Sequence, residues 1–297
     1  MAGPTPTLIG IPWDAHSSFM RGAAAAPPLV RQALLSPASN MWTESGIDLG
    51  APGMLGDAGD IGIPEGVDAV AAIEDAISRL MDDGGAPLAI GGDHAVTYPV
   101  VRAVAARHPG LTLLHIDAHP DLYDEFEGNR LSHACPFARI MEEGLATRLV
   151  QVGIRTANGH QREQARRFGV DVIDMRAWTA GSRPALTGPV YISIDLDGLD
   201  PAFAPGVSHR EPGGLSVRDV ISHLHALPAA PVGADIVEFN PARDVAGLTA
   251  HVAAKLLKEL AGRMQGATSS TRAALARVSR GRPRPPSPHQ ALGGPVR

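Results

Sequence analysis

Residues 111–121 read LTLLHIDAHPD, an apolar run that passes directly into a segment of aspartate and histidine. The same pattern occurs in PLAIGGDH, residues 87–94, and in PVYISIDLDGLDP, residues 189–201. Short apolar runs that end in glycine, aspartate or proline are typical of strands buried in a parallel sheet. Because the carboxyl ends of such strands meet along one edge of the sheet, we expect the three polar segments to converge there.

The rest of the chain alternates between strand and helix patterns. Strands are predicted at 7–11, 87–90, 111–116, 148–153, 170–173, 191–194 and 232–237, and helices at 27–35, 67–81, 97–107, 135–144, 159–168, 217–227 and 249–263. Residues 40–64 and 121–132 are predicted to be loops. This alternation predicts an α/β fold, a three-layer sandwich in which helices cover both faces of a parallel, doubly wound sheet.

Composition narrows the class of protein. The chain has 297 residues, of which 44% are hydrophobic and only 4% aromatic, so its core must be built mainly from aliphatic side chains. No apolar run reaches the roughly 18 residues of a membrane span, and the first residues lack the pattern of a signal peptide. The single cysteine, Cys135, excludes an internal disulfide. We therefore expect a cytoplasmic protein with no membrane association.

The last segment differs from the body. Residues 265–297 contain six arginines, no acidic residue and the stretch RGRPRPPSP at 280–288. This composition predicts a disordered basic tail after a catalytic domain at 1–264. The whole chain has a net charge of −5, so the body is more acidic still. An acidic body disfavours nucleic acid as a partner and suits a small cationic substrate.

The three polar segments carry the side chains that bind metal ions. The candidate ligands are His94, Asp117, His119, Asp121, Asp195 and Asp197. In an extended segment residues i, i+2 and i+4 point the same way, which predicts a shared direction for the ligands within 117–121 and within 195–197. The set contains no thiolate, which disfavours structural zinc and favours Mn²⁺, with Fe²⁺, Co²⁺ or Ni²⁺ as alternatives. It is large enough for two divalent cations.

Three neighbouring residues are interpreted as structural. Asp200 precedes a proline, a pair that favours the start of a turn. His115 lies inside its strand, where a hydrogen-bonded core histidine is expected. Cys135 is expected to pack rather than to react.

The three motifs, in this order, resemble those of the ureohydrolases, the arginase/agmatinase family, and the resemblance runs from about residue 7 to about residue 264. Three further stretches resemble plant-type arginases: SHACPFARIME at 132–142, APGVSHREPGGL at 204–215 and VEFNP at 237–241. The resemblance implies an arginase-like fold, two Mn²⁺ ions per subunit, and hydrolysis of a guanidino group to urea and an amine. It also implies a homo-oligomer, a trimer or a hexamer.

Residue roles follow from the same resemblance. One metal would be held by His94, Asp117, Asp121 and Asp195, and the other by His119, Asp117, Asp195 and Asp197, so that Asp117 and Asp195 bridge. Glu238 matches the glutamate that binds the guanidinium, and a carboxylate suits that planar cation. His133 matches the histidine that carries a proton to the leaving amine, while Asp121 would handle the proton of the attacking hydroxide.

The substrate is less sharply defined by these motifs. Overall resemblance to plant-type arginases favours L-arginine, with ornithine as the product. Animal-type arginases carry acidic residues after the Gly-x-Arg turn, whereas this chain has Thr156, Asn158 and Gln161 there. The acidic loop residues Asp124, Glu125 and Glu127 favour a cationic tail and hence agmatine. Agmatinase is therefore the alternative, and other guanidino acids stay open.

Two other classes of protein compete with this interpretation. A metal-dependent deacetylase or phosphatase could use a similar site, but the deacetylase would be expected to bind one catalytic zinc with fewer bridging carboxylates. A metal-binding regulator would tolerate the loss of His133 or Glu238. Metal content and urea release distinguish the ureohydrolase from the deacetylase or phosphatase.

Overall fold

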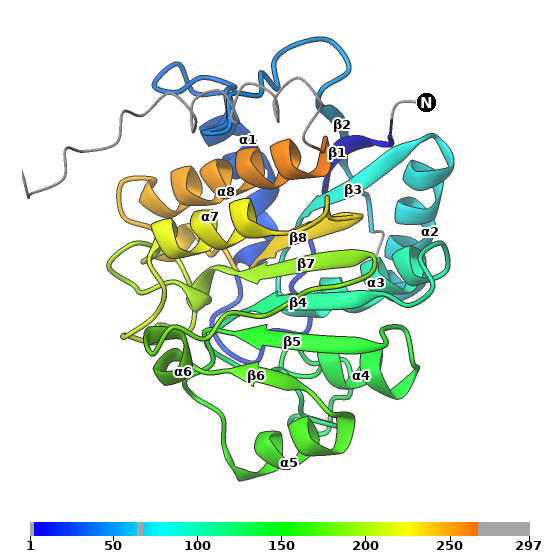
Figure 1. Cartoon of the computed structure of the whole chain (residues 1–297), viewed down its shortest axis with the longest axis vertical. Coiled ribbons are helices and arrows are strands. Elements are labelled where there is room, and N and C mark those ends of the chain that lie inside the picture. Colours follow the sequence, from blue (N-terminus) through cyan, green and yellow to red (C-terminus); the bar gives the residue numbers. More distant parts are fainter. Residues whose placement is uncertain (1–2, 64–67, 267–297) are drawn as a thin grey trace, which may run out of the picture. The chain divides into compact units, whose positions relative to one another are not determined.

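The computed structural model contains one parallel sheet of eight strands in the order β2-β1-β3-β8-β7-β4-β5-β6 (Figure 1). The structure describes residues 3–63 and 68–266. The strands are β1 (Thr5–Gly10), β2 (Gly56–Asp60), β3 (Gly85–Ile90), β4 (Thr112–Ile116), β5 (Arg148–Val152), β6 (Asp171–Ile173), β7 (Val190–Asp195) and β8 (Gly233–Val237). After β3 the chain re-enters the sheet at β4 and leaves two strand positions between them, which β7 and β8 fill later. The predicted fold class is confirmed.

Helices cover both faces of the sheet. They are α1 (Ala26–Leu34), α2 (Ala69–Asp82), α3 (Thr97–Ala105), α4 (Pro136–Glu142), α5 (Gly159–Phe168), α6 (Met175–Thr179), α7 (Val217–Ala226) and α8 (Leu248–Met264). Helices α1, α7 and α8 bury their apolar side chains in one core, whereas α2, α3 and α4 pack into a second core on the opposite face. The central strands contribute alternate residues to each core, which explains their continuous apolar runs.

Two elements were not predicted from the sequence. Strand β2 lies within 40–64, which was predicted to be a loop, and most of its residues are exposed. It pairs with β1 at the sheet edge, and Arg31 of α1 forms ion pairs with Asp57 and Asp60 beside it. An edge strand held by backbone and polar contacts lacks the apolar pattern used for prediction. The short helix α6 is capped by Asp174, whose carboxylate accepts from Ala177 N at 2.8 Å.

Two predicted segments fall partly outside the described residues. The helix expected at 67–81 begins at Ala69 after the N-cap Asp68, and residues 64–67 are not described. The predicted basic tail lies outside the described residues from position 267 onward, so its disorder and the domain boundary stay predictions. Within the described ranges, no helix is both long and apolar enough to cross a membrane.

Candidate metal centre

Each of the three motif segments leaves its strand through a turn closed by an aspartate. Asp117 Oδ1 accepts a hydrogen bond from His119 N at 2.6 Å, and Asp195 Oδ1 accepts one from Asp197 N at 2.8 Å. Asp93 Oδ1 accepts from Ala95 N at 3.1 Å in the same way. Such aspartate turns reverse the chain within two residues. As a result, the polar side chains that follow β3, β4 and β7 lie close together.

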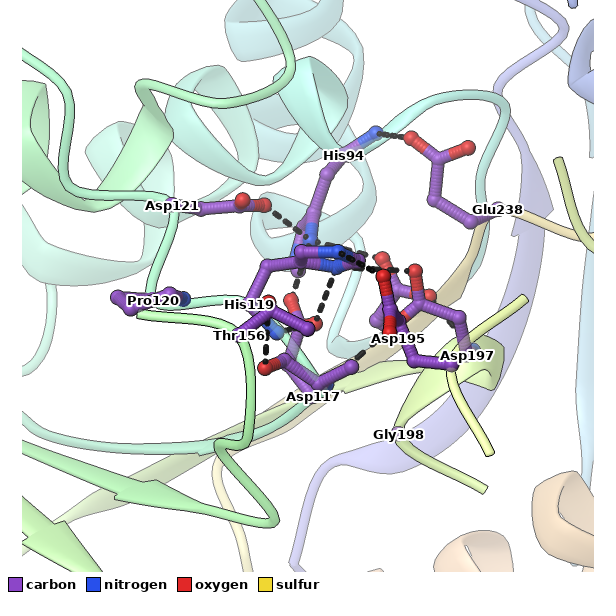
Figure 2. A network of polar contacts seen from close by, with 12 residues as sticks. His94, Asp117, His119, Pro120, Asp121, Thr156, Asp195, Asp197, Gly198 and Glu238 are labelled. Carbon is purple, nitrogen blue, oxygen red and sulfur yellow. Dashed lines mark hydrogen bonds and ion pairs between the residues drawn. The ribbon is translucent and has the colours of Figure 1, made fainter. Parts of the chain in front are cut away.

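The segments approach so closely that a glycine is required between two of them. A Cβ at Gly198 would lie 2.9 Å from the Cα and the nitrogen of Asp117, far inside normal contact. Glycine therefore lets the turn after β7 rest on the backbone after β4 (Figure 2). This contact is one reason why Asp197 lies beside Asp117, where its Oδ1 accepts a hydrogen bond from Ala118 N at 3.3 Å.

The predicted extended geometry of these segments is wrong. Residues 118 and 119 form a bend, and Asp121 has a φ of +49°, in the left-handed region that non-glycine residues rarely occupy. Asp197 lies in a short 3₁₀ turn, Leu196–Gly198, rather than on an extended strand. The ligands still converge because the aspartate turns direct them, and the strained Asp121 backbone is typical of a functional site.

Three carboxylates surround one nitrogen of His94 (Figure 2). Nδ1 lies 3.3 Å from Asp117 Oδ2, 2.9 Å from Asp121 Oδ2 and 3.2 Å from Asp195 Oδ2. All four side chains are buried, yet Nδ1 has no hydrogen-bond partner of acceptable geometry within the described residues. The other ring nitrogen, Nε2, lies 3.0 Å from Ser193 Oγ, which holds the ring in this orientation.

A second group forms beside the first. His119 Nδ1 lies 3.1 Å from Asp197 Oδ2 and 3.5 Å from Asp117 Oδ1, and one ligand atom from each of these residues lies within 4.8 Å of the others. Asp117 belongs to both groups because its two oxygens face opposite sides. The structure thus brings together all six predicted ligands, and the carboxylate of Asp117 approaches both histidines.

The donor chemistry fits divalent cations. No lysine or arginine forms an ion pair with the four aspartates anywhere in the described part of the chain. Burial raises the pKa of Asp195 well above its usual range and that of Asp197 to about 7, and neighbouring carboxylates add to both shifts. The carboxylate oxygens are clustered with no lysine or arginine paired to them, and the nitrogen between them, His94 Nδ1, has no hydrogen-bond partner within the described residues. Such a set of ligands is suited to a hard cation such as Mn²⁺.

Metal loading is expected to release protons. Because burial raises the pKa of Asp197 to about 7 and that of Asp195 well above its usual range, the metal-free protein holds protons that a cation must displace. Metal affinity should therefore rise with pH through neutrality. A raised carboxyl pKa also means that the folded state binds the extra proton, so the contribution of Asp197 to metal-free stability should fall as pH rises from about 4 to 7.

Calorimetric titration of Mn²⁺ at pH 6.5 in two buffers with different ionisation enthalpies would measure this release. The observed heats should differ in proportion to the buffer enthalpies. Identical heats in both buffers would show that the aspartates carry no displaceable protons.

His115 supports the centre from within its strand. Its Nδ1 accepts from Gln151 Nε2 at 3.0 Å, so Nε2 carries the proton and donates to Asp117 Oδ2 at 2.6 Å. The same Gln151 amide donates to Pro120 O at 2.6 Å. The prediction of a hydrogen-bonded core histidine is confirmed, and the contact orients a carboxylate shared by both groups.

Sequence reasoning missed Asp235, a second buried support. It lies inside β8 and accepts from Ser193 Oγ at 2.6 Å, Tyr191 OH at 2.7 Å and Thr97 Oγ1 at 3.0 Å. Ser193 in turn faces His94 Nε2. The signal in the sequence was an acid in the middle of an otherwise apolar strand, GADIV.

The ligands open into a cavity of about 190 Å³. Its lining comprises Ser18, His119, Asp121, Tyr123, Phe126, His133, Ala134, Thr156, Gln161, Asp195, Asp197, His209 and Glu238. Glu238 has a φ of +64°, and its Oε1 accepts from His94 N at 2.9 Å and from His133 Nδ1 at 2.8 Å. The two residues predicted for substrate and proton chemistry therefore face each other beside the ligand cluster.

His133 is held from both sides. Its Nε2 lies 2.8 Å from Ser18 Oγ and 3.2 Å from Ser18 N. Burial lowers the pKa of His133, but the adjacent Glu238 carboxylate more than compensates and raises it to about 9. Asp93 positions the segment that carries Ser18, since its Oδ2 accepts from His16 N at 3.0 Å and from Ser17 Oγ at 3.2 Å. Neither Asp93 nor Ser18 was identified from the sequence, because their partners are far away along the chain.

The acidic residues of the loop, Asp124, Glu125 and Glu127, do not line the cavity. Glu125 and Glu127 are exposed, and Asp124 pairs with His160 at 3.0 Å. Tyr123 and Phe126 from the same loop face the cavity instead, as do Thr156 and Gln161. The reason given for a cationic substrate tail is therefore not supported by the structure.

Three smaller predictions concern residues near the site. Asn158 caps α5 and donates to Tyr123 OH at 2.5 Å rather than lining the cavity. Asp200 accepts from the backbone nitrogens of Ala202 and Gly213, which confirms its turn role. Cys135 is fully buried, and burial raises the pKa of its thiol to about 12, in agreement with a packing role.

Comparison with known proteins places the chain in a family. Residues 5–262 match the sequence profile of the Arginase family. The chain belongs to the Arginase family. It is 50% identical over 281 residues to "Arginase 1, mitochondrial" of Arabidopsis thaliana, covering 89% of this chain and 82% of that protein. The resemblance to plant-type arginases is confirmed.

Solved structures of this family superpose on the chain. The arginase from Medicago truncatula matches with a TM-score of 0.85 and 48% identity, covering 89% of this chain and 88% of that one. A hypothetical agmatinase from Burkholderia thailandensis matches with a TM-score of 0.80 and 30% identity, covering 89% and 86%. Within this family, the agmatinase is the more distant of the two.

The comparison also corrects the expected localisation. The plant arginases from Arabidopsis thaliana, Oryza sativa and Medicago truncatula are all named mitochondrial, which overturns the prediction of a cytoplasmic protein. The prediction rested on the single Cys135, and the absence of disulfides does not distinguish the cytoplasm from other reducing compartments.

Proposed function

We propose that this protein is a manganese-dependent arginase that hydrolyses L-arginine to L-ornithine and urea. The observation that carries the proposal is the buried carboxylate of Glu238, which opens into the same cavity as the ligand groups around His94 and His119. A carboxylate at that position provides a planar partner for a guanidinium beside the metal ligands.

Two Mn²⁺ ions are proposed, one held by the His94 group and one by the His119 group, with Asp117 and Asp195 shared between them. When bound, the pair would supply Lewis acidity and an activated water nucleophile. Asp121, whose oxygen lies 2.9 Å from His94 Nδ1, is proposed to take the proton of that water. The expected homotrimer or homohexamer is retained as part of the proposal, and sedimentation velocity of the metal-loaded protein tests it.

Glu238 is proposed to bind and orient the guanidinium. Its Oε1 is occupied by His94 N and His133 Nδ1, whereas Oε2 has no hydrogen-bond partner within the described residues. A guanidinium that donates to Oε2 would lie in the cavity that the ligand cluster also lines. Orientation at a fixed distance removes much of the entropic cost of reaction.

His133 is proposed to supply the proton that the leaving amine takes. With a pKa of about 9 the ring is protonated at neutral pH, and its Nδ1–H donates to Glu238 Oε1 at 2.8 Å. The products then balance: cleavage of the guanidinium C–N bond gives urea and the amine of ornithine.

Replacement of His133 by asparagine should lower kcat by about 10² without loss of metal, because a positioned general acid contributes about 10²–10⁴. In the wild type, kcat should fall as pH rises above about 9, when the ring loses its proton. Steady-state kinetics across pH 7–10.5 would show both effects. His160→Asn, at an exposed histidine, is the control. An unchanged kcat in His133→Asn would remove this residue from proton transfer.

L-Arginine is proposed over agmatine because the cavity wall around the substrate tail is neutral. Thr156 and Gln161 line it, and the acids of the nearby loop point elsewhere. A zwitterionic amino-acid tail is better matched by neutral donors and acceptors than a lone ammonium, which would favour a facing carboxylate.

Urea release by Mn²⁺-loaded protein tests the proposal directly. L-Arginine, agmatine, guanidinobutyrate and guanidinopropionate are supplied separately, and kcat/KM for L-arginine should exceed the others by at least about tenfold, or about 1.4 kcal/mol. A higher value for agmatine would make the protein an agmatinase. No urea from any of the four, in protein shown to hold metal, would overturn the proposed function.

A further inference from the structure

A second and larger cavity lies outside the metal centre. It has a volume of about 560 Å³ and is formed by α5, β6, α6 and the segment after β5, at the β6 end of the sheet (Figure 1). Ile154, Ala165, Val172 and Met175 give it an apolar lining. Its volume is within the range of small-molecule sites, about 300–1,000 Å³.

Two arginines at this cavity lack partners. Arg162 and Arg166 lie one turn apart on α5, line the cavity and are exposed. Neither side chain forms a hydrogen bond or an ion pair within the described part of the chain. By contrast, the guanidinium of Arg155 is committed to backbone carbonyls, including Asp197 O at 2.7 Å.

The arrangement of these two arginines is not explained by the helix itself. Like charges at positions i and i+4 repel each other and weaken a helix. The helix dipole favours a cation in the last turn, which accounts for Arg166 but not for Arg162 near the start of α5. The one acid in the lining, Asp174, is used as the N-cap of α6 and pairs only at 3.5 Å with Arg176.

We propose that this cavity binds a small organic anion whose carboxylate or phosphate group is held between Arg162 and Arg166. Guanidinium groups bind both anions through paired, charge-assisted hydrogen bonds. The apolar body of the ligand would lie on Val172 and Met175. Val172 is 41% exposed, and the bound ligand would cover part of that surface.

The second cavity shares a lining residue with the cavity at the metal centre. Gln161, which is buried, lines both cavities and completes the capping box of α5. Pro120 lines the second cavity and stands between the ligands His119 and Asp121 (Figure 2). A ligand that draws Arg162 and Arg166 together acts on the helix that carries Gln161. Occupancy is therefore expected to change KM for the substrate at the first cavity.

Calorimetry with the metal-loaded, full-length protein tests the proposal without relying on activity. The probes are phenyl phosphate, hexanoate and inorganic phosphate. We expect one saturable site for phenyl phosphate or hexanoate, with inorganic phosphate at least tenfold weaker because it lacks an apolar body. The tighter of the two organic probes identifies the anionic group.

Variants locate the site. The double substitution Arg162→Gln and Arg166→Gln should weaken the organic probe at least tenfold, whereas Arg167→Gln should not, because Arg167 lies on the same helix but stacks over Phe168. Val172→Asn should weaken the organic probe and leave inorganic phosphate unchanged. Added probe should shift KM in the wild type and not in the double variant.

Four outcomes would overturn the proposal. They are the absence of saturable binding, an equal loss in Arg167→Gln, displacement of the probe by L-ornithine in direct competition, and a smaller mass of the double variant in sedimentation velocity. The first two would show that no built site exists. The third would place the probe in the metal cavity, and the fourth would show that a second copy of the chain occupies the face.

Discussion

Replacement of Asp117 by asparagine is expected to strip metal from the protein and to reduce urea release by about 10³ or more, since the metal supplies the nucleophile. Asp117 is fully buried and belongs to both ligand groups. Asparagine has one uncharged oxygen where aspartate has two charged ones. The NH₂ group of asparagine would face the N–H of His119 or of His115, each of which now donates to a carboxylate oxygen, and one of these donors would lose its acceptor.

Metal content measured by plasma mass spectrometry after dialysis, together with urea release, would test this result. Asp82→Asn provides a matched control, because Asp82 pairs with Arg107 at an exposed position. The control should keep full metal content and activity. If Asp117→Asn kept both metals, the residue would not be shared between them, and the proposed bridging role would be wrong.

Replacement of Glu238 by glutamine should cause the second-largest effect, through the substrate rather than the metal. The substitution keeps the shape of the side chain but removes its charge at a site that is 5% exposed. Loss of one partner in a buried charge pair costs about 2–5 kcal/mol, which corresponds to a loss of about 30-fold to about 5,000-fold in kcat/KM for L-arginine. The pKa of His133 should fall as well, because the Glu238 charge is what raises it.

Three measurements separate this effect from misfolding. Metal content should stay at the wild-type value, since Glu238 is not among the proposed ligands. Binding of L-ornithine, which lacks a guanidinium, should change far less than binding of L-arginine. The decline of kcat at high pH should begin at a lower pH than in the wild type. Equal loss of arginine and ornithine binding would contradict a role in guanidinium recognition.

The fold could be predicted where burial controls the choice of residues. Strands β4 and β7 are buried on both faces and are therefore mostly apolar, which made them visible in the sequence. Strand β2 was missed because it is an exposed edge strand held by backbone hydrogen bonds and by Arg31. The same logic applies to the site. Ligands at strand ends stood out as clustered acids and histidines, whereas Asp93 and Asp235 act through partners distant in sequence.

The sequence by itself determined the class of fold and the family and singled out the candidate metal ligands, because strand burial and ligand chemistry each demand particular residue types at short, regular spacings. Only the tertiary structure decided how the ligands converge and which nearby charges face the substrate. The aspartate turns, the left-handed backbone at Asp121 and the contact of Gly198 with Asp117 depend on the approach of separate strands. The direction of Asp124 away from the cavity likewise depends on how its loop packs, and local spacing carries no information about contacts made across the sheet.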